Sequence, residues 1–166
     1  MVTGGMSSTD VLHVLNNLVG AGCRVWVGGG WGVDALAGKQ TRQHRDLDLA
    51  LDSAQESVAI AVLTDQAFRI ETDWRPARVE LAAPGGRLVD LHPVVFGPTG
   101  DGVQADVNGG LFTYPAAGFV TGVIGGRVVP CLSIEQQITF HTGYEPRDVD
   151  LADLRLLHEL AVSVRP

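Results

Sequence analysis

Apolar residues in this chain follow two spacings, one typical of helices and the other of strands. Four segments have apolar residues three and four positions apart, as on one face of an amphipathic helix: 8–19, 53–63, 133–141 and a last one from about 148. Seven shorter runs alternate or are rich in β-branched residues, as strands are: 23–27, 46–52, 68–72, 78–82, 88–95, 119–124 and 127–130. A short helix is expected over 31–37. The pattern predicts an α+β fold.

Local signals mark where several of these elements begin and end. Ser8 or Thr9 can cap the first helix, since hydroxyl side chains accept hydrogen bonds from the first turn. The segments from Ser53 to Glu56 and from Ser133 to Gln136 have the capping-box pattern that opens a helix. Gly143 is expected to end the helix that Ser133 opens.

Glycine-rich turns connect the strand-like runs. Pro84-Gly85-Gly86 and Gly125-Gly126 each separate two such runs, so each predicts a hairpin, which would make the sheet antiparallel or mixed. The segment from Phe96 to Ala117 lacks a clear period and predicts a long loop that ends near a short extended piece at 111–114. Long loops in compact domains tend to be functional.

Two carboxylates share one face of the most regular strand. The leucines of 46–52 point to one side, and Asp46 and Asp48 point to the other. The two carboxylates repel each other unless a cation lies between them. Carboxylate oxygens are suitable ligands for Mg²⁺ that also contacts substrate phosphates. A third acid, Asp90, shares a strand face with His92. The three acids are candidate metal ligands.

A glycine turn follows the first strand and precedes the expected short helix. Gly29 and Gly30 have no Cβ, so their N–H groups can come close to an anion, and a helix N-terminus favours phosphate oxygens. Arg42 and His44 lie in the polar segment 38–45, directly before the acidic pair. They are equally well interpreted as counter-charges for a triphosphate or as part of a solvated loop.

Composition narrows the classes of partner. With 166 residues the chain is expected to form one domain, 1–166, and its net charge of −7 argues against non-specific binding to nucleic acid or an anionic membrane. It has no basic start followed by a long apolar core and no run that approaches a membrane span, so a cytoplasmic protein is expected. Cys23 and Cys131 have neither disulfide-framework nor zinc spacing and are expected to be reduced core thiols.

In this order the motifs resemble the DNA polymerase β-type nucleotidyltransferase superfamily. The stretches Gly29-Gly30-Trp31-Gly32-Val33-Asp34, Arg42-x-His44-x-Asp46-Leu47-Asp48 and Val89-Asp90-Leu91-His92-Pro93 resemble the lincosamide and aminoglycoside 2″-adenylyltransferase group within it. A later stretch from Cys131 to Glu145, which includes Tyr144, is also similar. Fifteen residues separate Gly30 from Asp46, which is longer than the generic superfamily spacing but suits this group.

The resemblance implies a mixed, largely antiparallel nucleotidyltransferase sheet flanked by helices. The hairpin and helices from about 119 would complete the acceptor side of the single domain. The implied reaction is Mg²⁺-dependent transfer of a nucleoside monophosphate, AMP in the expected case, from ATP or another nucleoside triphosphate to a hydroxyl of an aminoglycoside or lincosamide antibiotic. Pyrophosphate leaves, two Mg²⁺ ions take part, and a homodimer is a reasonable hypothesis.

The resemblance also assigns roles to residues. Three acids are the candidate metal ligands and catalytic residues: Asp46, Asp48 and Asp90. Asp90 is the candidate general base, since a free alcohol is a poor nucleophile near neutral pH. Four residues are candidates for holding the nucleotide: Gly29, Gly30, Arg42 and His44. Three more are candidate acceptor contacts: His92, Glu80 and Tyr144.

Some alternatives stay open. His92 is also the second candidate base, with a structural role as the other possibility, and Glu80 is alternatively a cross-strand partner of Arg78 or Arg87. At the level of function, the alternatives are a nucleotidyltransferase toxin that modifies tRNA or a protein, and a non-catalytic module that binds nucleotide. An ordinary acidic domain would leave the glycine turn and the three acids unconnected. The sequence names neither the nucleotide nor the acceptor hydroxyl.

Overall fold

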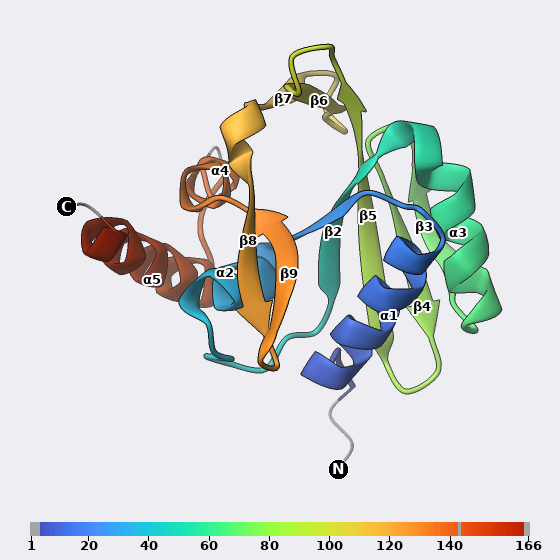
Figure 1. Ribbon diagram of the computed structural model, residues 1–166, viewed down its shortest axis with the longest axis horizontal. Coiled ribbons are helices and arrows are strands. Elements are labelled where there is room, and N and C mark those ends of the chain that lie inside the picture. The colour runs from blue at the N-terminus through green and yellow to red at the C-terminus, as the bar shows by residue number, and fades with distance from the viewer. Residues whose placement is uncertain (1–3, 143, 165–166) are drawn as a thin grey trace.

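The computed structural model describes residues 4–142 and 144–164 (Figure 1). The strands are β1 (Val25–Gly28), β2 (Leu47–Asp52), β3 (Arg69–Trp74), β4 (Arg78–Ala83), β5 (Arg87–Phe96), β6 (Gly102–Ala105), β7 (Leu111–Tyr114), β8 (Phe119–Ile124) and β9 (Arg127–Leu132). The helices are α1 (Ser8–Gly20), α2 (Gly29–Ala37), α3 (Glu56–Asp65), α4 (Ile134–Phe140) and α5 (Asp148–Val164), with single 3-10 turns at Ser53–Gln55 and Ala116–Gly118. In this described part of the chain, no helix combines the length and the apolar composition that crossing a membrane requires.

The strands form one mixed sheet. Seven lie side by side in the order β3–β4–β5–β2–β1–β9–β8, and β6 and β7 continue from the end of β5. The pairings of β1 with β9 and of β2 with β5 are parallel, and the other pairings are antiparallel. Figure 1 shows α2, α4 and α5 on the opposite side of the molecule from α3. The predicted mixed, largely antiparallel sheet with flanking helices is confirmed.

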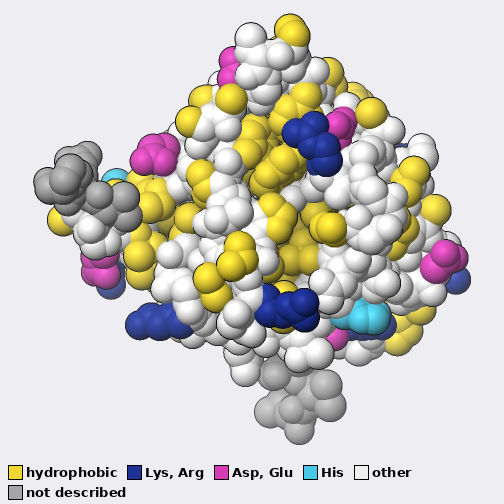
Figure 2. All heavy atoms as spheres, in the orientation of Figure 1, with side chains coloured by type: hydrophobic (Ala, Val, Ile, Leu, Met, Phe, Trp, Pro, Cys, Tyr) yellow, Lys and Arg dark blue, Asp and Glu magenta, His cyan; other side chains and the backbone are white. Residues whose placement is uncertain are grey.

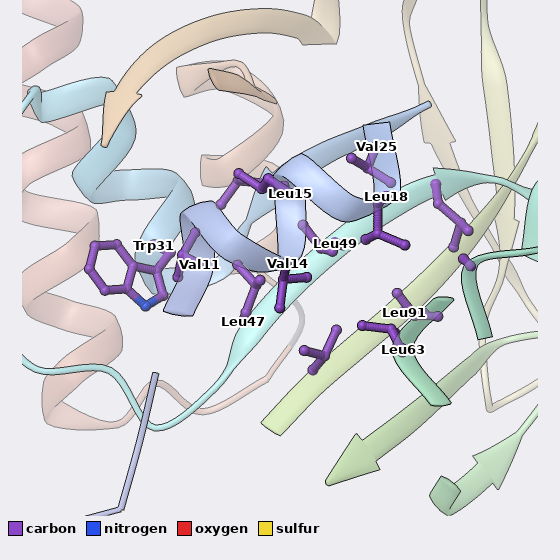
Figure 3. Close-up of a cluster of buried hydrophobic side chains, with 14 of the residues drawn as sticks. Val11, Val14, Leu15, Leu18, Val25, Trp31, Leu47, Leu49, Leu63 and Leu91 are labelled. Atoms are coloured by element: carbon purple, nitrogen blue, oxygen red, sulfur yellow. The ribbon is translucent and has the colours of Figure 1, made fainter. Parts of the chain in front are cut away.

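The core lies between the sheet and the helices α1 and α3. Figure 3 shows apolar side chains of these helices packed on the leucines of β2 and β5. Leu47, Leu49 and Leu51 are fully buried, as the alternation predicts, and each contributes roughly 1.5–3 kcal/mol through burial. Because successive side chains of a strand point to opposite faces, Asp48 projects away from α1.

The face that carries α1 has its charges dispersed. Figure 2 shows basic and acidic side chains of the described residues scattered over this face, with apolar side chains between them. The carboxylates of Asp48 and Asp90 project from the opposite face of β2 and β5. Both cysteines are buried as free thiols, as expected: Cys23 and Cys131.

The helix starts differ from two of the expectations. Ser7, not Ser8 or Thr9, caps α1, and it forms a capping box with Asp10. The capping box predicted at Ser53 is wrong, because the Asp52 side chain accepts the Ala54 N–H and holds a 3-10 turn before α3.

The expected start of α4 is correct. Ser133 caps this helix by accepting the Gln136 N–H. The Gln136 side chain does not return to the cap and instead donates to the carbonyl of Thr113, so only half of the capping box forms. The predicted stop at Gly143 lies outside the described residues.

The prediction of a long loop from Phe96 to Ala117 is wrong in part. This segment contains the hairpin of β6 and β7, which pairs with the end of β5 through Val95 and Phe96. The extended piece expected at 111–114 is β7, with the same bounds. β6 was not predicted, because four residues are too few to establish a period. The hairpin buries two polar side chains, those of Gln104 and Tyr114.

Candidate active site

Four neighbouring strands bring one residue each into a row across the sheet. Gly28 pairs with Asp48, Asp48 pairs with Asp90, and Asp90 pairs with Glu80. Residues that pair directly across strands project to the same face, so these carboxylates lie together. Glu80 and Asp90 are direct neighbours on this face. Glu80 forms no ion pair within the described residues, and Arg78, two residues earlier on the same strand, binds Asp90 instead.

The row lines a cleft of about 840 Å³. Its other lining residues come from the segment before β2, from the β6–β7 hairpin and from α4 and α5. Ten charged residues line it, six acidic and four basic: Asp46, Asp48, Glu80, Asp90, Asp150, Asp153, Arg42, Arg45, Arg78 and Arg147. Because like charges in one cleft repel each other, the excess of carboxylates favours the binding of cations.

Three side chains of the cleft lie close enough to share an ion. One ligand atom each from Asp48, Asp90 and His92 falls within 4.8 Å of the others. His92 Nε2 lies 3.1 Å from Asp48 Oδ1 and 3.6 Å from Asp90 Oδ2. Burial alone would lower the pKa of His92, but its hydrogen bond to Asp48 and the charges of both acids raise the pKa overall. Asp46 lines the same cleft but is not part of this three-residue group.

Asp90 is the most buried of the acids in the row. Its Oδ2 accepts a hydrogen bond of 2.7 Å from Arg78, whose guanidinium lies over the Trp74 ring. Its Oδ1 is buried and has no hydrogen-bond partner among the described residues. Burial, with the nearby charge of Asp48, raises the pKa of Asp90 to about 6. A buried carboxylate oxygen without a partner is costly, and a divalent cation would satisfy it, so these residues fit a metal ion.

The electrostatics of Asp46 resemble those of Asp90. Burial raises the pKa of Asp46, the charge of Asp48 adds to the rise, and Arg45 opposes it. A cation in the cleft would favour the ionised forms of these acids.

The glycine turn makes room for the charged side chains. Gly29 has a φ of +57°, and a Cβ there would collide with the Asp48 carboxylate. A Cβ at Gly30 would collide with the His44 ring and the Arg42 guanidinium. Both glycines line the cleft at the N-terminus of α2, whose first N–H groups have no side-chain cap. A phosphate contact at this turn stays a prediction.

His44 lies behind the cleft. It is buried, its Nε2 pairs with Asp34 Oδ2 at 2.5 Å, and its ring packs on Trp31. Asp34 also accepts hydrogen bonds from the backbone and hydroxyl of Thr41. The solvated-loop interpretation is therefore wrong for His44, and His44 is not among the residues that line the cleft. The geometry gives it a role in anchoring segment 38–45.

Arg42 lines the cleft and connects that segment to α5. Its Nη2 lies 2.9 Å from Asp153 Oδ2, and its Nε also donates to the same carboxylate. The Asp153 carboxylate is almost fully buried and lies 3.9 Å from His141 Nε2. Arg42 is thus near the α2 N-terminus while its charge is partly neutralised.

Aromatic side chains of the β6–β7 hairpin and α4 line another part of the cleft. Phe112 packs edge-on against Phe140, and Tyr114 packs against the same ring. Tyr144 is about half exposed at the cleft. Its partial burial and the nearby Asp150 raise its pKa. The cleft thus combines a charged row with an aromatic surface.

Sequence reasoning did not single out several of the lining residues: Arg78, Gln104, Phe112, Tyr114, Phe140, Arg147, Asp150 and Asp153. Arg78 had a detectable signal, since it alternates with Glu80 on one strand face. The hairpin residues Gln104, Phe112 and Tyr114 had no signal of a role in the site, because the pattern predicted mainly a loop for their segment.

Comparisons with known proteins place this arrangement in a family context. Residues 10–157 match the model of the family described as aminoglycoside-2″-adenylyltransferase. The chain is 32% identical over 160 residues, 96% of its length and 99% of the relative's, to a lincosamide resistance protein of Staphylococcus haemolyticus. It is 31% identical over 135 residues, 78% of its length and 71% of the relative's, to a 2″-aminoglycoside nucleotidyltransferase of Escherichia coli.

Solved structures give the same result for the fold. The lincomycin-bound lincosamide antibiotic adenylyltransferase LnuA superimposes with a TM-score of 0.85 and 32% identity, over 94% of this chain and 99% of that one. The structure of ANT(2″)-Ia in complex with adenylyl-2″-tobramycin has a TM-score of 0.73 and 20% identity, over 93% and 92% of the two chains. The second likeness is one of fold alone.

Proposed function

Because the chain belongs to the aminoglycoside-2″-adenylyltransferase family, we propose that it transfers AMP from ATP to a hydroxyl of a small antibiotic and releases pyrophosphate. The chain is a nucleotidyltransferase, and the proposal concerns its nucleotide, its metal and its acceptor. The observation that carries it is the row of Asp48 and Asp90 beside the N-terminus of α2, in one cleft.

Asp48 and Asp90, with Asp46 beside them, would hold Mg²⁺ in this proposal. The unpartnered Oδ1 of Asp90 and the raised pKa values of Asp46 and Asp90 support it, because burial and the neighbouring acids outweigh the nearby cations at both carboxylates. Bound ions would neutralise the charge of the triphosphate and activate the acceptor hydroxyl.

The triphosphate is proposed to lie against Gly29 and Gly30. The free N–H groups at the start of α2 favour phosphate oxygens through both hydrogen bonding and the helix dipole. Arg42 would leave Asp153 and bind phosphate oxygens through its guanidinium. His44 would act on the nucleotide only indirectly, by holding the backbone on which Arg42 lies.

Asp90 is proposed as the general base. It would take the proton of the acceptor hydroxyl as the hydroxyl oxygen bonds to the α-phosphorus and the bond to pyrophosphate breaks. The raised pKa of Asp90 supports this role, because in the metal-free protein this carboxylate accepts a proton more readily than an ordinary aspartate does.

Lincosamides are the first proposed acceptor class and aminoglycosides the second. Of the two carboxylates that α5 brings to the cleft, Asp150 is paired with Arg147, and only Asp153 would become free for an amine once Arg42 binds phosphate. The aromatic surface of Phe112 and Phe140 favours an acceptor with apolar groups. Phe140 of α4 and the lining residues of α5 support the proposal that the chain from about 119 completes the acceptor side.

A homodimer is part of the proposal. Four exposed apolar residues lie on β5 and the β6–β7 hairpin: Val95, Val103, Val107 and Leu111. Exposed apolar surface of this kind is typical of protein interfaces. Sedimentation equilibrium is expected to give twice the chain mass at assay concentrations, and a monomer alone would contradict this part.

Mass spectrometry tests the proposed reaction. The protein is incubated with Mg²⁺, each of the four nucleoside triphosphates, and a panel of lincosamides and aminoglycosides. We expect an AMP adduct of a lincosamide that is absent with Asp48→Asn and retained with Asp73→Asn, which removes an exposed acid paired with Arg75. Adducts from neither class, despite metal-dependent binding of triphosphate, would contradict the acceptor assignment.

A further inference from the structure

We propose that Gln104 and Tyr114 are positioning residues that hold His92 as an Nε2–H donor to Asp48, so that His92 orients a metal-binding acid without binding the metal. The effect of this arrangement on catalysis rests on the proposed function. The arrangement itself rests on a chain of hydrogen bonds from the β6–β7 hairpin to the row of acids.

The first step fixes the orientation of the Gln104 amide. Its Nε2 lies 3.0 Å from the backbone carbonyl of Ala77, which can only accept a hydrogen bond. The nitrogen must therefore face Ala77, and the oxygen faces the Tyr114 hydroxyl at 2.5 Å. Burial raises the pKa of Tyr114, so this hydroxyl keeps its proton and donates it to Gln104. Both side chains are buried, so water has little access to these hydrogen-bonding groups and does not set the orientation of the amide.

The second step fixes the tautomer of His92. The remaining N–H of the Gln104 amide points at His92 Nδ1, 3.2 Å away. Nδ1 must supply a lone pair to accept this hydrogen bond, so the proton of the neutral ring lies on Nε2. Nε2 is 3.1 Å from Asp48 Oδ1, in position to donate to it. Each donor in the chain from Tyr114 to Asp48 thus has one acceptor.

The third step concerns the metal. A ring nitrogen that carries a proton has no free lone pair, so His92 Nε2 is not a ligand even though its distance to Asp48 and Asp90 would allow a shared ion. The same proton removes Nε2 as a base. The hydrogen bond instead restrains Asp48 Oδ1, while Oδ2 lies beside Gly29. Residues that orient ligands in this way set the affinity of many metal sites.

The pairing of the hairpin brings Gln104 and Tyr114 together. Gly102 pairs with Tyr114, and Gln104 lies two residues further along the same strand, on the same face. The segment therefore connects the aromatic surface of the cleft to the acids. Tyr114 contacts both the Phe140 ring and Gln104, so an acceptor that binds on the aromatic surface lies next to the residues that hold His92.

Nitrogen NMR of metal-free, ¹⁵N-histidine-labelled protein tests the tautomer, at a pH where the His92 ring is neutral. His92→Gln identifies its resonances. We expect an unprotonated Nδ1 and a protonated Nε2 in the wild type. In Gln104→Met, which keeps the size of the side chain and removes the amide, the Nδ1 resonance should shift towards that of an unprotonated nitrogen without a hydrogen-bond donor. Gln136→Met is the matched control, since this buried amide bonds to Thr113, and it should leave His92 unchanged. A proton on Nδ1 of wild-type His92 would overturn the proposal without any variant, as would an unchanged Nδ1 resonance in Gln104→Met.

Metal binding tests the consequence. With Mn²⁺ as the probe, electron-spin-echo spectra should lack the coupling of a directly bound histidine nitrogen. Calorimetry should find Mn²⁺ affinity reduced about 10-fold in Gln104→Met, as for other residues that orient ligands, and nearly unchanged in Gln136→Met. A bound His92 nitrogen would overturn the proposal. Neither measurement needs substrate, so a protein that transfers nothing to an antibiotic would refute the proposed function and leave this result readable.

Discussion

At the scale of single residues, the cleft contains a polar atom without a hydrogen-bond partner and backbone positions that have no room for a side chain. Asp90 has a buried oxygen without a partner, and Gly29 and Gly30 occupy positions where any side chain would displace a neighbour. These features lower the stability of the metal-free protein, because buried unpaired polar groups are costly. They are the expected properties of a site that is completed by its ligands.

The first prediction concerns the glycine turn. Gly29→Ala should lower the free energy of unfolding by roughly 1–3 kcal/mol, because alanine at a φ of +57° is strained and its Cβ meets the Asp48 carboxylate. Gly20→Ala in α1 is the control. A Cβ there meets no atom within 4 Å, so it should stabilise by about 0.5–1 kcal/mol. Equal effects in urea denaturation would contradict this account of the turn.

The second prediction concerns the pKa of Asp90, which is about 6 in the folded state against an ordinary value of 3.8. The folded state holds this proton more tightly than the unfolded chain does, so ionisation of Asp90 destabilises metal-free protein as the pH rises through this interval. The loss amounts to roughly 3 kcal/mol when complete. Asp90→Asn cannot ionise and escapes this loss.

Denaturant titrations in the presence of a chelator measure this effect. The free energy of unfolding of Asp90→Asn, minus that of wild type, should increase between about pH 4 and pH 6 and then level off. A difference that stays constant over this range would contradict the raised pKa. Added Mg²⁺ should reduce the difference, because it stabilises the ionised carboxylate of the wild type.

At the scale of elements, the site depends on segments that are distant in sequence. The Asp34–His44 pair anchors segment 38–45, and the Arg42–Asp153 pair then connects that segment to α5. Nucleotide that draws Arg42 towards its phosphates would also release Asp153, so the two sides of the cleft are coupled through one ion pair.

The third prediction follows from this pair. Arg42→Gln should raise the KM for the nucleoside triphosphate about 10-fold or more, because a charge-assisted contact to phosphate contributes about 1.5–3 kcal/mol. Arg127→Gln, at an exposed position of β9, should leave KM unchanged. The assay is steady-state transfer at varied nucleotide concentration, and an unchanged KM in Arg42→Gln would exclude Arg42 from the nucleotide site.

Local sequence patterns predicted some of these elements, but not those that depend on distant partners. The alternation of leucine and aspartate in β2 and the glycine turn before α2 predicted the central strands and placed the acids on one face, since both signals are local. The extended piece expected at 111–114 is β7, but β6 and the hairpin pairing were missed because β6 is short and its partner is the distant end of β5. The buried pair of His44 and Asp34 was not predicted, because only the tertiary structure brings these two side chains together.

At the scale of the whole molecule, the sheet carries the core on one face and the candidate site on the other. The whole chain has a net charge of −7, and the cleft shares this acidic balance, with six carboxylates against four arginines. Bound metal and nucleotide would then belong to the stable form of the protein. Ligands that bind only the folded state raise its stability by mass action.

The central claim is that the acids of this cleft carry out metal-dependent transfer of AMP to an acceptor. The most direct test measures pyrophosphate release from ATP and Mg²⁺, with and without lincomycin, for the wild type and for Asp90→Asn. The account predicts release that requires lincomycin, matches the AMP adduct one to one, and falls about 10²–10⁴-fold in Asp90→Asn. Release that is independent of an acceptor, or equally fast in Asp90→Asn, would contradict it.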